Sequence, residues 1–205
     1  MSVVFVIDDD PSVRSTLKFL IGTVGLDVET FASTDSFLQR KLPDVPSCLV
    51  LDVRLPGLSG LDFQRVLMAR NIRIPIIFMT GYGDIQMGVR AMKSGAVEFL
   101  TKPFRDQDLL DAVRIALERD QDRRERERDI GELQERFSSL SAREQEVACM
   151  VVAGKLNKQI AGELGTAENT VKVHRSRAME KMNAQSLADL VRMLEKLKSA
   201  SASPL

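Results

Sequence analysis

The sequence predicts an α/β fold class for its first half: a doubly wound, five-stranded parallel sheet. A long helical linker then joins this sheet to a C-terminal all-α domain of four helices. Short apolar runs alternate with amphipathic helical patterns over the first half of the 205 residues, which is typical of a parallel sheet covered on both faces. A polar stretch without glycine or proline follows, and beyond it only helical spacing recurs.

Five strands are predicted: four apolar runs, residues 3–7, 48–51, 74–79 and 97–100, and a short strand over residues 26–31. Continuous apolar runs of this length are typical of parallel strands buried on both faces. Helix caps, helix ends and turn residues lie between them. These are Asp9-Asp10-Pro11, Gly25, Ser33 or Thr34, Pro56-Gly57, Ser59-Gly60, Asp84, Gly95 and Asp106.

Polar side chains follow four of these runs where each strand ends. They are Asp8, Asp9, Asp52, Thr80 and Lys102. In a doubly wound sheet, ligands bind outside the carboxyl ends of the strands. We therefore expect these side chains to converge on one small pocket.

Such a pocket has a definite chemistry. Asp8, Asp9, Asp10 and Asp52 would repel one another unless a cation lies between them, and oxygen ligands suit Mg²⁺. A lysine and a hydroxyl complete a set suited to phosphoryl transfer, with Asp52 as the simplest acceptor. Taken singly, each residue also has a plain structural interpretation, as a helix cap, a turn residue or a surface charge. Neither a GxxxxGK[ST] loop nor a GxGxxG motif is found in the sequence.

Residues 118–137 form the predicted linker. The stretch ERDQDRRERERD, residues 118–129, contains no apolar residue, and its acids nearly match its arginines. A solvated helix is the expected structure, and a basic nucleic-acid arm is disfavoured. Ile130, Leu133, Phe137 and Leu140 then recur at a spacing of three and four, a seam that packs on the last domain or on another chain.

Four helical patterns follow the linker. Ser141 and Glu144 form a capping box, Asn157 caps a short helix over residues 158–164, and longer patterns cover residues 168–182 and about 186–197. A short helix, a glycine turn and a longer helix are typical of a helix-turn-helix. Residues 1–117, 118–137 and 138–198 are thus the predicted sheet domain, linker and helical domain, and residues 199–205 a frayed tail.

The helix over residues 168–182 has two faces at 100° per residue. Val171, Ala178 and Met182 lie on the predicted buried face. The opposite face can enter the major groove of DNA, with Lys172 and Val173 near base edges. Arg175, Arg177 and Lys158 suit phosphate contacts. A four-helix scaffold with a solvated polar face explains the charges equally well.

The totals limit the class of protein. The chain carries 29 basic and 29 acidic residues, but residues 138–205 carry ten basic and seven acidic ones, which permits nucleic-acid binding without requiring it. Cys48 and Cys149 stand alone in apolar settings, as buried thiols of a reducing compartment do. No apolar stretch is long enough to span a membrane, and no leader precedes the first strand. We expect a soluble, cytoplasmic protein that does not bind membranes.

The motifs VIDDD, LDVRLPGLSG, IIFMTGYGD and AMKSGAVEFLTKPF resemble the receiver domain of bacterial response regulators over residues 1 to about 117. The resemblance implies that Asp52 accepts a phosphoryl group from the phosphohistidine of a sensor histidine kinase. It implies that Asp9, Asp52 and the carbonyl oxygen of Arg54 bind Mg²⁺, while Asp8 holds a metal-bound water.

The same resemblance implies three further roles. Lys102 pairs with a phosphate oxygen and is joined to Pro103 by a cis peptide bond. Thr80 moves toward the phosphoryl group, and Phe99 turns inward behind it. Many receivers have tyrosine at this last position, so Phe99 keeps the ring of that switch but lacks the hydroxyl.

The motifs LSAREQEV, GKLNKQIA and TVKVH resemble the four-helix module of the NarL/LuxR type, and the two halves together resemble FixJ-type transcription factors. Family base-contacting positions fall on Lys172, Val173 and Ser176, of which Ser176 is short for such a contact. The full set of residues expected at the DNA is Lys158, Thr170, Lys172, Val173, Arg175, Ser176 and Arg177.

The predicted function is a response regulator that is not an enzyme. Phosphorylation of Asp52 promotes formation of a homodimer and binding to promoter DNA, and the regulator activates transcription with RNA polymerase as a partner. One alternative is a phosphatase or phosphotransferase with an aspartyl phosphate, although Arg54 stands where such an enzyme would want a second aspartate. Others are a binding module with a degenerate acidic pocket, and an output domain that binds a protein instead of DNA.

Overall fold

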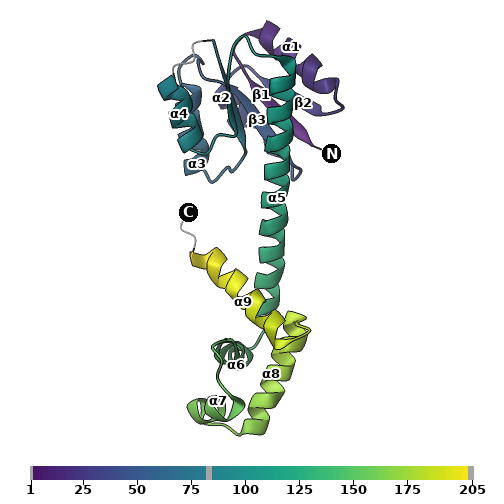
Figure 1. Cartoon of the computed structure of the whole chain (residues 1–205), viewed down its shortest axis with the longest axis vertical. Coiled ribbons are helices and arrows are strands. Elements are labelled where there is room, and N and C mark those ends of the chain that lie inside the picture. The colour runs from purple at the N-terminus through teal and green to yellow at the C-terminus, as the bar shows by residue number, and fades with distance from the viewer. Residues whose placement is uncertain (1, 82–84, 203–205) are drawn as a thin grey trace. The chain divides into compact units, whose positions relative to one another are not determined.

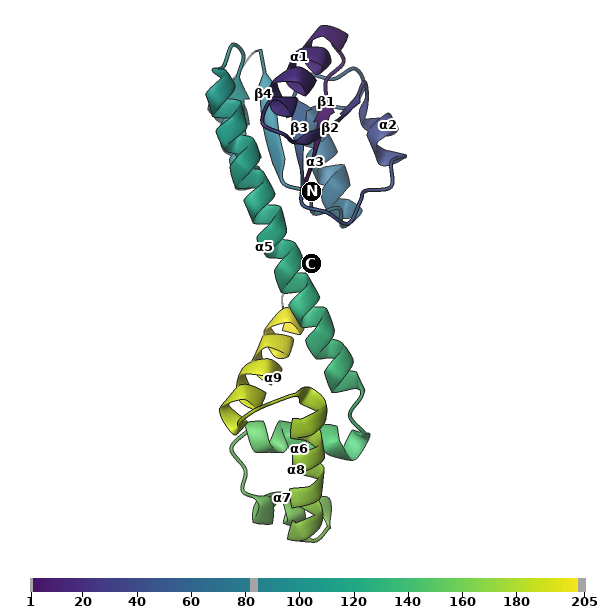
Figure 2. The same ribbon diagram turned by 90° about the vertical axis from the view of Figure 1, so that its right-hand side faces the viewer.

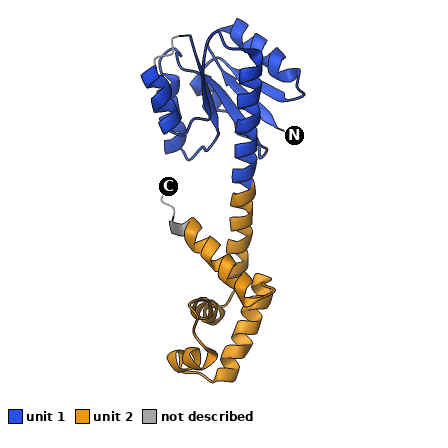
Figure 3. Ribbon diagram, viewed as in Figure 1, with its two compact units in different colours: residues 1–124 blue, residues 125–205 orange. Residues whose placement is uncertain are grey.

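The computed structural model describes residues 2–81 and 85–202, with the side chains of residues 201 and 202 left aside. The chain divides into two compact units, residues 1–124 and residues 125–205 (Figure 3). Helix α5 spans Asp106–Ser138 and so contributes residues to both units.

The first unit is built on a five-stranded parallel sheet with the order β2-β1-β3-β4-β5. Figure 1 shows this sheet among its helices. Its strands are β1 (Val3–Ile7), β2 (Asp27–Phe31), β3 (Ser47–Asp52), β4 (Ile76–Thr80) and β5 (Glu98–Thr101). Its helices are α1 (Pro11–Gly22), α2 (Thr34–Leu38), α3 (Gly60–Ala69), α4 (Ile85–Lys93) and the first part of α5. The predicted fold class is confirmed for this half of the chain.

Two separate cores cover the two faces of this sheet, because successive residues of a strand point to opposite faces. Phe5 and Leu49 lie in a core that includes side chains of α2, α3 and α4. Val4 and Val50 lie in the other core, with side chains of α1 and α5. Figure 2 shows the ribbons of these two helices beside the sheet. This arrangement explains why β1, residues 48–51 of β3 and residues 76–79 of β4 are apolar throughout.

Most predicted helix starts lie at or next to the observed ones. Asp10, Ser33 and Ser59 cap α1, α2 and α3 with their side-chain oxygens. Asp106 is the first helical residue of α5 and does not precede the helix. The predicted cap Asp84 lies outside the described residues.

The linker prediction needs one correction. The stretch 118–129 is helical, as expected, but it is not uniformly solvated, because Asp120 is fully buried and Arg124 is largely covered. Asp120 and Arg124 are covered because they form an ion pair, and not because this part of the helix has a hydrophobic face. A stretch without apolar residues gives no sequence signal of such burial.

The second unit contains the end of α5 together with α6 (Ala142–Val152), α7 (Asn157–Leu164), α8 (Glu168–Met182) and α9 (Leu187–Ala202). The predicted seam packs inside this unit: Leu133 and Leu140 are buried against side chains of α6, α8 and α9. The all-α fold class of this half is confirmed. Asn157 is the first residue of α7 and not its cap, which is Leu156.

Two further expectations for this half were wrong. Helix α9 continues to Ala202, so residues 199–202 are helical and not a frayed tail. Cys149 is exposed, whereas Cys48 is buried as expected. In α6 the buried positions are Glu144, Val147, Ala148 and Val151, which places Cys149 on the opposite side of that helix.

Among the helices of the described residues, none combines the length and the apolar composition needed to span a membrane. The longest, α5, is strongly charged.

Candidate functional site

Asp8 and Asp52 are brought together by the topology of the sheet. Strands β1 and β3 are neighbours, with Ile7 paired to Leu51. Asp8 follows β1 directly, and Asp52 is the last residue of β3. The chain leaves β1 for β2 on one side and returns to β3 on the other, and such a reversal opens a crevice at the carboxyl ends of the strands.

Lys102 follows the edge strand β5 and contacts both of these carboxylates. Its Nζ lies 2.8 Å from Asp8 Oδ2 and 2.8 Å from Asp52 Oδ1. The backbone places it there, because Lys102 N donates to the carbonyl oxygen of Thr80 at 2.7 Å. The peptide bond from Lys102 to Pro103 is cis, as the resemblance implied. Three residues of the expected pocket therefore do meet.

The second oxygen of each carboxylate accepts a backbone hydrogen bond. Asp8 Oδ1 accepts from Asp10 N at 2.9 Å, and Asp52 Oδ2 accepts from Arg54 N at 2.7 Å. Only 2% of Asp8 and 6% of Asp52 is exposed, so both charges depend on these partners.

The ammonium of Lys102 is held in its charged form. Burial alone would lower the pKa of Lys102, but its hydrogen bonds to Asp52 and Asp8, together with their negative charges, raise the pKa above its ordinary value. Lys102 therefore stays protonated at neutral pH and presents one positive charge to two carboxylates.

Two residues that the sequence did not single out shape this site. Arg14, on α1, donates through Nη1 to the carbonyl oxygens of Asp8 at 2.7 Å and Asp9 at 3.0 Å, and so fixes the loop after β1. Gly60, the first residue of α3, lies against the end of β3, since a Cβ atom on it would be 2.4 Å from the carbonyl oxygen of Asp52. For Arg14, the sequence did offer a signal of this role, which is an arginine one turn into the helix that follows the acidic run.

The other two acids of the run behave differently. Asp10 does not join the cluster, because its carboxylate caps α1 by accepting from Ser12 N at 2.8 Å. Asp9 is exposed. Within residues 2–81 and 85–202, no three acidic, histidine or cysteine side chains are gathered closely enough to hold a metal. Of the four acids, Asp8 and Asp52 meet at Lys102, whereas Asp10 caps α1 and Asp9 is exposed.

The donor set nevertheless fits Mg²⁺ in its chemistry. Asp8 and Asp52 together carry two negative charges against the single charge of Lys102, which leaves one negative charge at a buried site. Carboxylate and carbonyl oxygens are the hard ligands that this ion prefers. Asp9 and the Arg54 carbonyl follow the same two strands in the chain.

Thr80 and Phe99 lie on the β4 and β5 side of the site. Thr80 ends β4 and is fully buried. Phe99 is partly buried, with its ring centroid 6.4 Å from that of Phe78. Helix α4 confines the ring, since a Cβ atom on Gly88 would lie 3.3 Å from Phe99 Cδ1. The switching roles of Thr80 and Phe99 stay predictions.

Helix α8 presents the face that the sequence assigned to DNA. Val171, Ala178 and Met182 are buried, as the helical angles predicted. Arg175 is partly exposed, and the exposed members of the predicted set are Lys158 on α7 and Thr170, Lys172, Val173, Ser176 and Arg177 on α8. Lys172 lies 3.6 Å from Glu168, one turn earlier on the helix, and its side chain is 59% exposed. These residues are accessible on α7 and α8 of the second unit.

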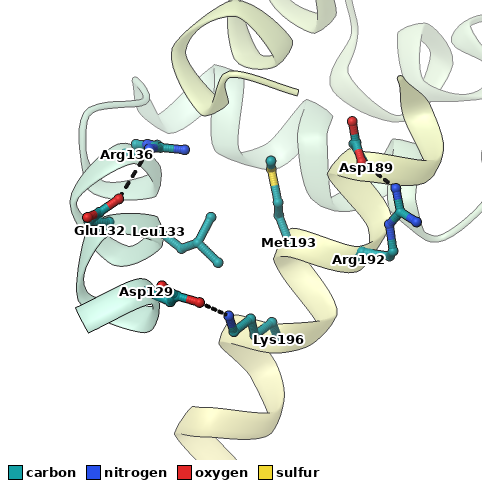
Figure 4. A pocket seen from close by; sticks show the side chains of 8 residues that line it. All are labelled: Asp129, Glu132, Leu133, Arg136, Asp189, Arg192, Met193 and Lys196. Carbon is teal, nitrogen blue, oxygen red and sulfur yellow. Dashed lines mark hydrogen bonds and ion pairs between the residues drawn. The ribbon is translucent and has the colours of Figure 1, made fainter. Parts of the chain in front are cut away.

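A groove in the second unit lies between the end of α5 and α9 (Figure 4). Leu133 and Met193 form its apolar part. Its acids face bases: Asp129 lies 2.9 Å from Lys196, Glu132 3.4 Å from Arg136, and Asp189 pairs with Arg192. These pairs neutralise the groove from within, and the one between Asp129 and Lys196 joins the two helices.

Comparison with known proteins identifies the family. Residues 4–114 match the response regulator receiver domain, and residues 138–194 match the bacterial regulatory proteins of the luxR family. The chain belongs to the bacterial response regulators. This response regulator is 59% identical over 196 residues to nodulation protein W of Bradyrhizobium diazoefficiens, covering 96% of this chain and 86% of that protein.

Two further relatives agree with this assignment. The transcriptional regulatory protein FixJ of Azorhizobium caulinodans is 44% identical and covers 93% of this chain and 90% of its own length. A low-resolution structure of the response regulator StyR is 51% identical, covers 95% of this chain and 98% of that chain, and superposes with a TM-score of 0.85. The chain is thus a transcriptional response regulator, as the sequence predicted.

Proposed function

We propose that Asp52 accepts a phosphoryl group from the phosphohistidine of a sensor histidine kinase, and that this reaction controls binding of α8 to promoter DNA. The observation that carries the proposal is the contact of Lys102 Nζ with both Asp8 and Asp52, at 2.8 Å each. A surface aspartate would not require such a partner. A carboxylate held beside a lysine at a strand end is placed to receive a phosphate.

The chain's own residues account for most of the chemistry. A carboxylate oxygen of Asp52 attacks phosphorus, the bond from phosphorus to the histidine nitrogen breaks, and the electron pair stays on the imidazole. As the Asp52 carboxylate becomes an acyl phosphate, Lys102 is released from it and pairs with a phosphate oxygen. Asp9, Asp52 and the Arg54 carbonyl would hold Mg²⁺, with Asp8 acting through a water. The ion supplies neutralisation of the charge on the transferred group.

The response to phosphorylation involves Thr80 and Phe99. The Thr80 hydroxyl moves to bond a phosphate oxygen, and Phe99 turns into the space that this movement leaves. The resulting shift in population favours a homodimer. Two copies of α8 then bind adjacent half-sites more tightly than one does, and the bound dimer recruits RNA polymerase to activate transcription.

The test is labelling of the full chain with acetyl phosphate in the presence of Mg²⁺. We expect the wild-type protein to take up phosphate, Asp52→Asn to take up none, and Asp35→Asn, a change at an exposed acid on α2, to label like the wild type. Gel mobility of the phosphoprotein and mass spectrometry of the intact chain give the readout. Lack of label on the wild type, or retention of it by Asp52→Asn, contradicts the proposal.

The proposal also holds that the chain is a switch and not an enzyme. Its relatives named above include a transcriptional regulatory protein, and residue 54 is an arginine. We expect a small phosphate ester to be consumed at no more than one event per protein molecule. Sustained turnover measured by phosphate release would favour an aspartyl-phosphate enzyme instead.

A further inference from the structure

A buried ion cluster lies at the opposite end of β3 from Asp52. Asp120, on α5, has no exposed surface. Its Oδ2 accepts from Ser47 N, the first residue of β3, at 2.9 Å. The strand that ends on the phosphoacceptor is therefore held at its start by a side chain of α5.

Two arginines complete this cluster from the same helix. Arg123 Nη2 lies 2.6 Å from Asp120 Oδ1, and Arg124 Nε lies 2.7 Å from Asp120 Oδ2. Arg124 Nη1 also reaches Asp44, in the segment before β3, at 2.6 Å. Arg123 and Arg124 are only 29% and 19% exposed, so the aspartate is enclosed by its partners.

A cluster of this kind is more than a solvated turn of helix. A buried carboxylate is costly unless charged partners and hydrogen bonds satisfy it, and this one is satisfied by one backbone amide and two guanidinium groups. Its charge acts on the core: burial, and then the negative charge of Asp120, raise the pKa of the neighbouring Cys48 thiol. Leu117 is the last residue of α5 that packs in the receiver core. The cluster therefore holds α5 to the start of β3 over about two helical turns beyond Leu117, in a stretch that contains no apolar residue.

We propose that Asp120 is a positioning residue that ties the phosphoacceptor strand to α5. A change at Asp52 then passes along β3 to Ser47, to Asp120 and so to residues 125–138 of the same helix. The inference rests on the proposed function of Asp52 and adds the route by which that site acts on the output half of the chain. Coupling of this type needs one element that both sites bias, and α5 is that element.

Hydrogen exchange of the full chain, measured by mass spectrometry with and without acetyl phosphate and Mg²⁺, tests the route. The variants are Asp120→Asn, and Asp122→Asn as a matched control at an acid of the same helix that is not buried. Labelling of Asp52 is measured on the same samples. A residue with a merely structural role would alter exchange equally in both states, so the readout is the difference that phosphorylation makes in residues 125–138.

We expect wild type and Asp122→Asn to show that difference. Asp120→Asn should label Asp52 to a similar extent but lose the difference by about fivefold or more. A full difference in Asp120→Asn, or none in a wild type that labels, overturns the inference. A wild type that does not label overturns the proposed function itself.

A second variant covers the case in which Asp120→Asn fails to fold. Arg124→Gln removes one of the two guanidinium groups that hold Asp120 beside Ser47, together with the link to Asp44, and so weakens the attachment of α5 to the start of β3. If Arg124→Gln labels, a reduced difference in residues 125–138 supports the coupling, and an unchanged one overturns it.

Discussion

The two units use their charged residues in opposite ways. In residues 1–124, Asp8, Asp52 and Asp120 are buried, and each is satisfied by named partners. In residues 125–205, the charged residues assigned to DNA lie exposed on α7 and α8. In the first unit these charged groups are satisfied by partners within the fold, whereas in the second the charged side chains stay accessible to a binding partner.

The assembly of the two sites differs as well. The pair formed by Lys102 and Asp8 joins residues 94 positions apart, so that site exists only in the folded sheet. The proposed DNA face comes largely from one helix, over residues 168–182. We therefore expect single changes at the first site to affect stability and chemistry together, and changes on α8 to affect binding alone.

The largest effect is expected from Lys102→Met. Asp8 and Asp52 would then be buried without their shared cation, which should cost about 3 kcal/mol of stability and slow labelling of Asp52 by about 10- to 100-fold. Urea unfolding and acetyl-phosphate labelling measure the two effects. Because excess Mg²⁺ can take the place of the missing charge, it should recover part of the stability.

Lys93→Met is the control for this change, because Lys93 is an exposed lysine at the end of α4. It should leave both measurements unchanged. If Lys102→Met behaved like this control, the shared cation at Asp8 and Asp52 would contribute neither to stability nor to labelling, which contradicts the contrast between the two units.

Gly60→Ala should have the next largest effect. The added Cβ would lie 2.4 Å from the carbonyl oxygen of Asp52 and 3.1 Å from Val53 Cα, and backbone atoms cannot move aside as a side chain can. We expect a loss of about 1–3 kcal/mol in urea unfolding, with slower labelling because Asp52 is displaced.

Gly22→Ala is its matched control, since a Cβ atom at Gly22 would meet nothing within 4 Å. That change should be neutral or stabilising by up to about 1 kcal/mol. Equal effects of the two substitutions would show that the contact with β3 does not matter.

The difference between the units also explains what the sequence could predict. Strand ends can be read from apolar runs, and a parallel sheet brings its carboxyl ends together, so these runs alone predict that Asp8, Asp52 and Lys102 share one site. The buried face of α8 follows from spacing alone, and Val171, Ala178 and Met182 are buried as predicted.

Other features could not be predicted, because they depend on partners that local pattern does not reveal. Asp120 lies in a wholly polar stretch, and its burial requires Ser47, 73 positions away. The acidic run predicts a capping carboxylate before Pro11 but does not say whether Asp9 or Asp10 provides it, and the bond from Ser12 N assigns it to Asp10. Sequence pattern carries no information on either choice, whereas contact geometry decides both.

On the exposed face of α8 in the second unit, Lys172→Ala and Arg177→Ala should reduce DNA affinity without changing stability. We expect about 1–3 kcal/mol from Lys172 if it reads a base, and a salt slope lower by about one from Arg177 if it contacts a phosphate. A duplex selected by the wild-type protein from a random pool is the probe, titrated by fluorescence anisotropy at several salt concentrations.

Lys198→Ala removes the same charge from an exposed position on α9 and should change affinity little. If Lys172→Ala and Arg177→Ala bound DNA with the same affinity as Lys198→Ala and the wild type, an output domain that binds a protein would be favoured.

The smallest effect is expected at Glu144, the one carboxylate of the second unit that resembles those of the first among the described residues. It is buried, accepts from Lys181 Nζ at 2.7 Å and from Ser141 N at 2.8 Å, and these bonds, that of Lys181 foremost, hold its pKa below the ordinary 4.5. A lowered pKa in the folded state means that the contribution to stability is present above pH 4.5 and is lost as the pH falls below it.

Glu144→Gln should therefore destabilise the chain in urea at about pH 7, and the gap to the wild type should close as the pH falls below 4.5. Glu146→Gln, at an exposed position of the same helix, should change stability little at either pH. A gap for Glu144→Gln that persists unchanged into acid would mean that packing, and not the charge, is what this position contributes.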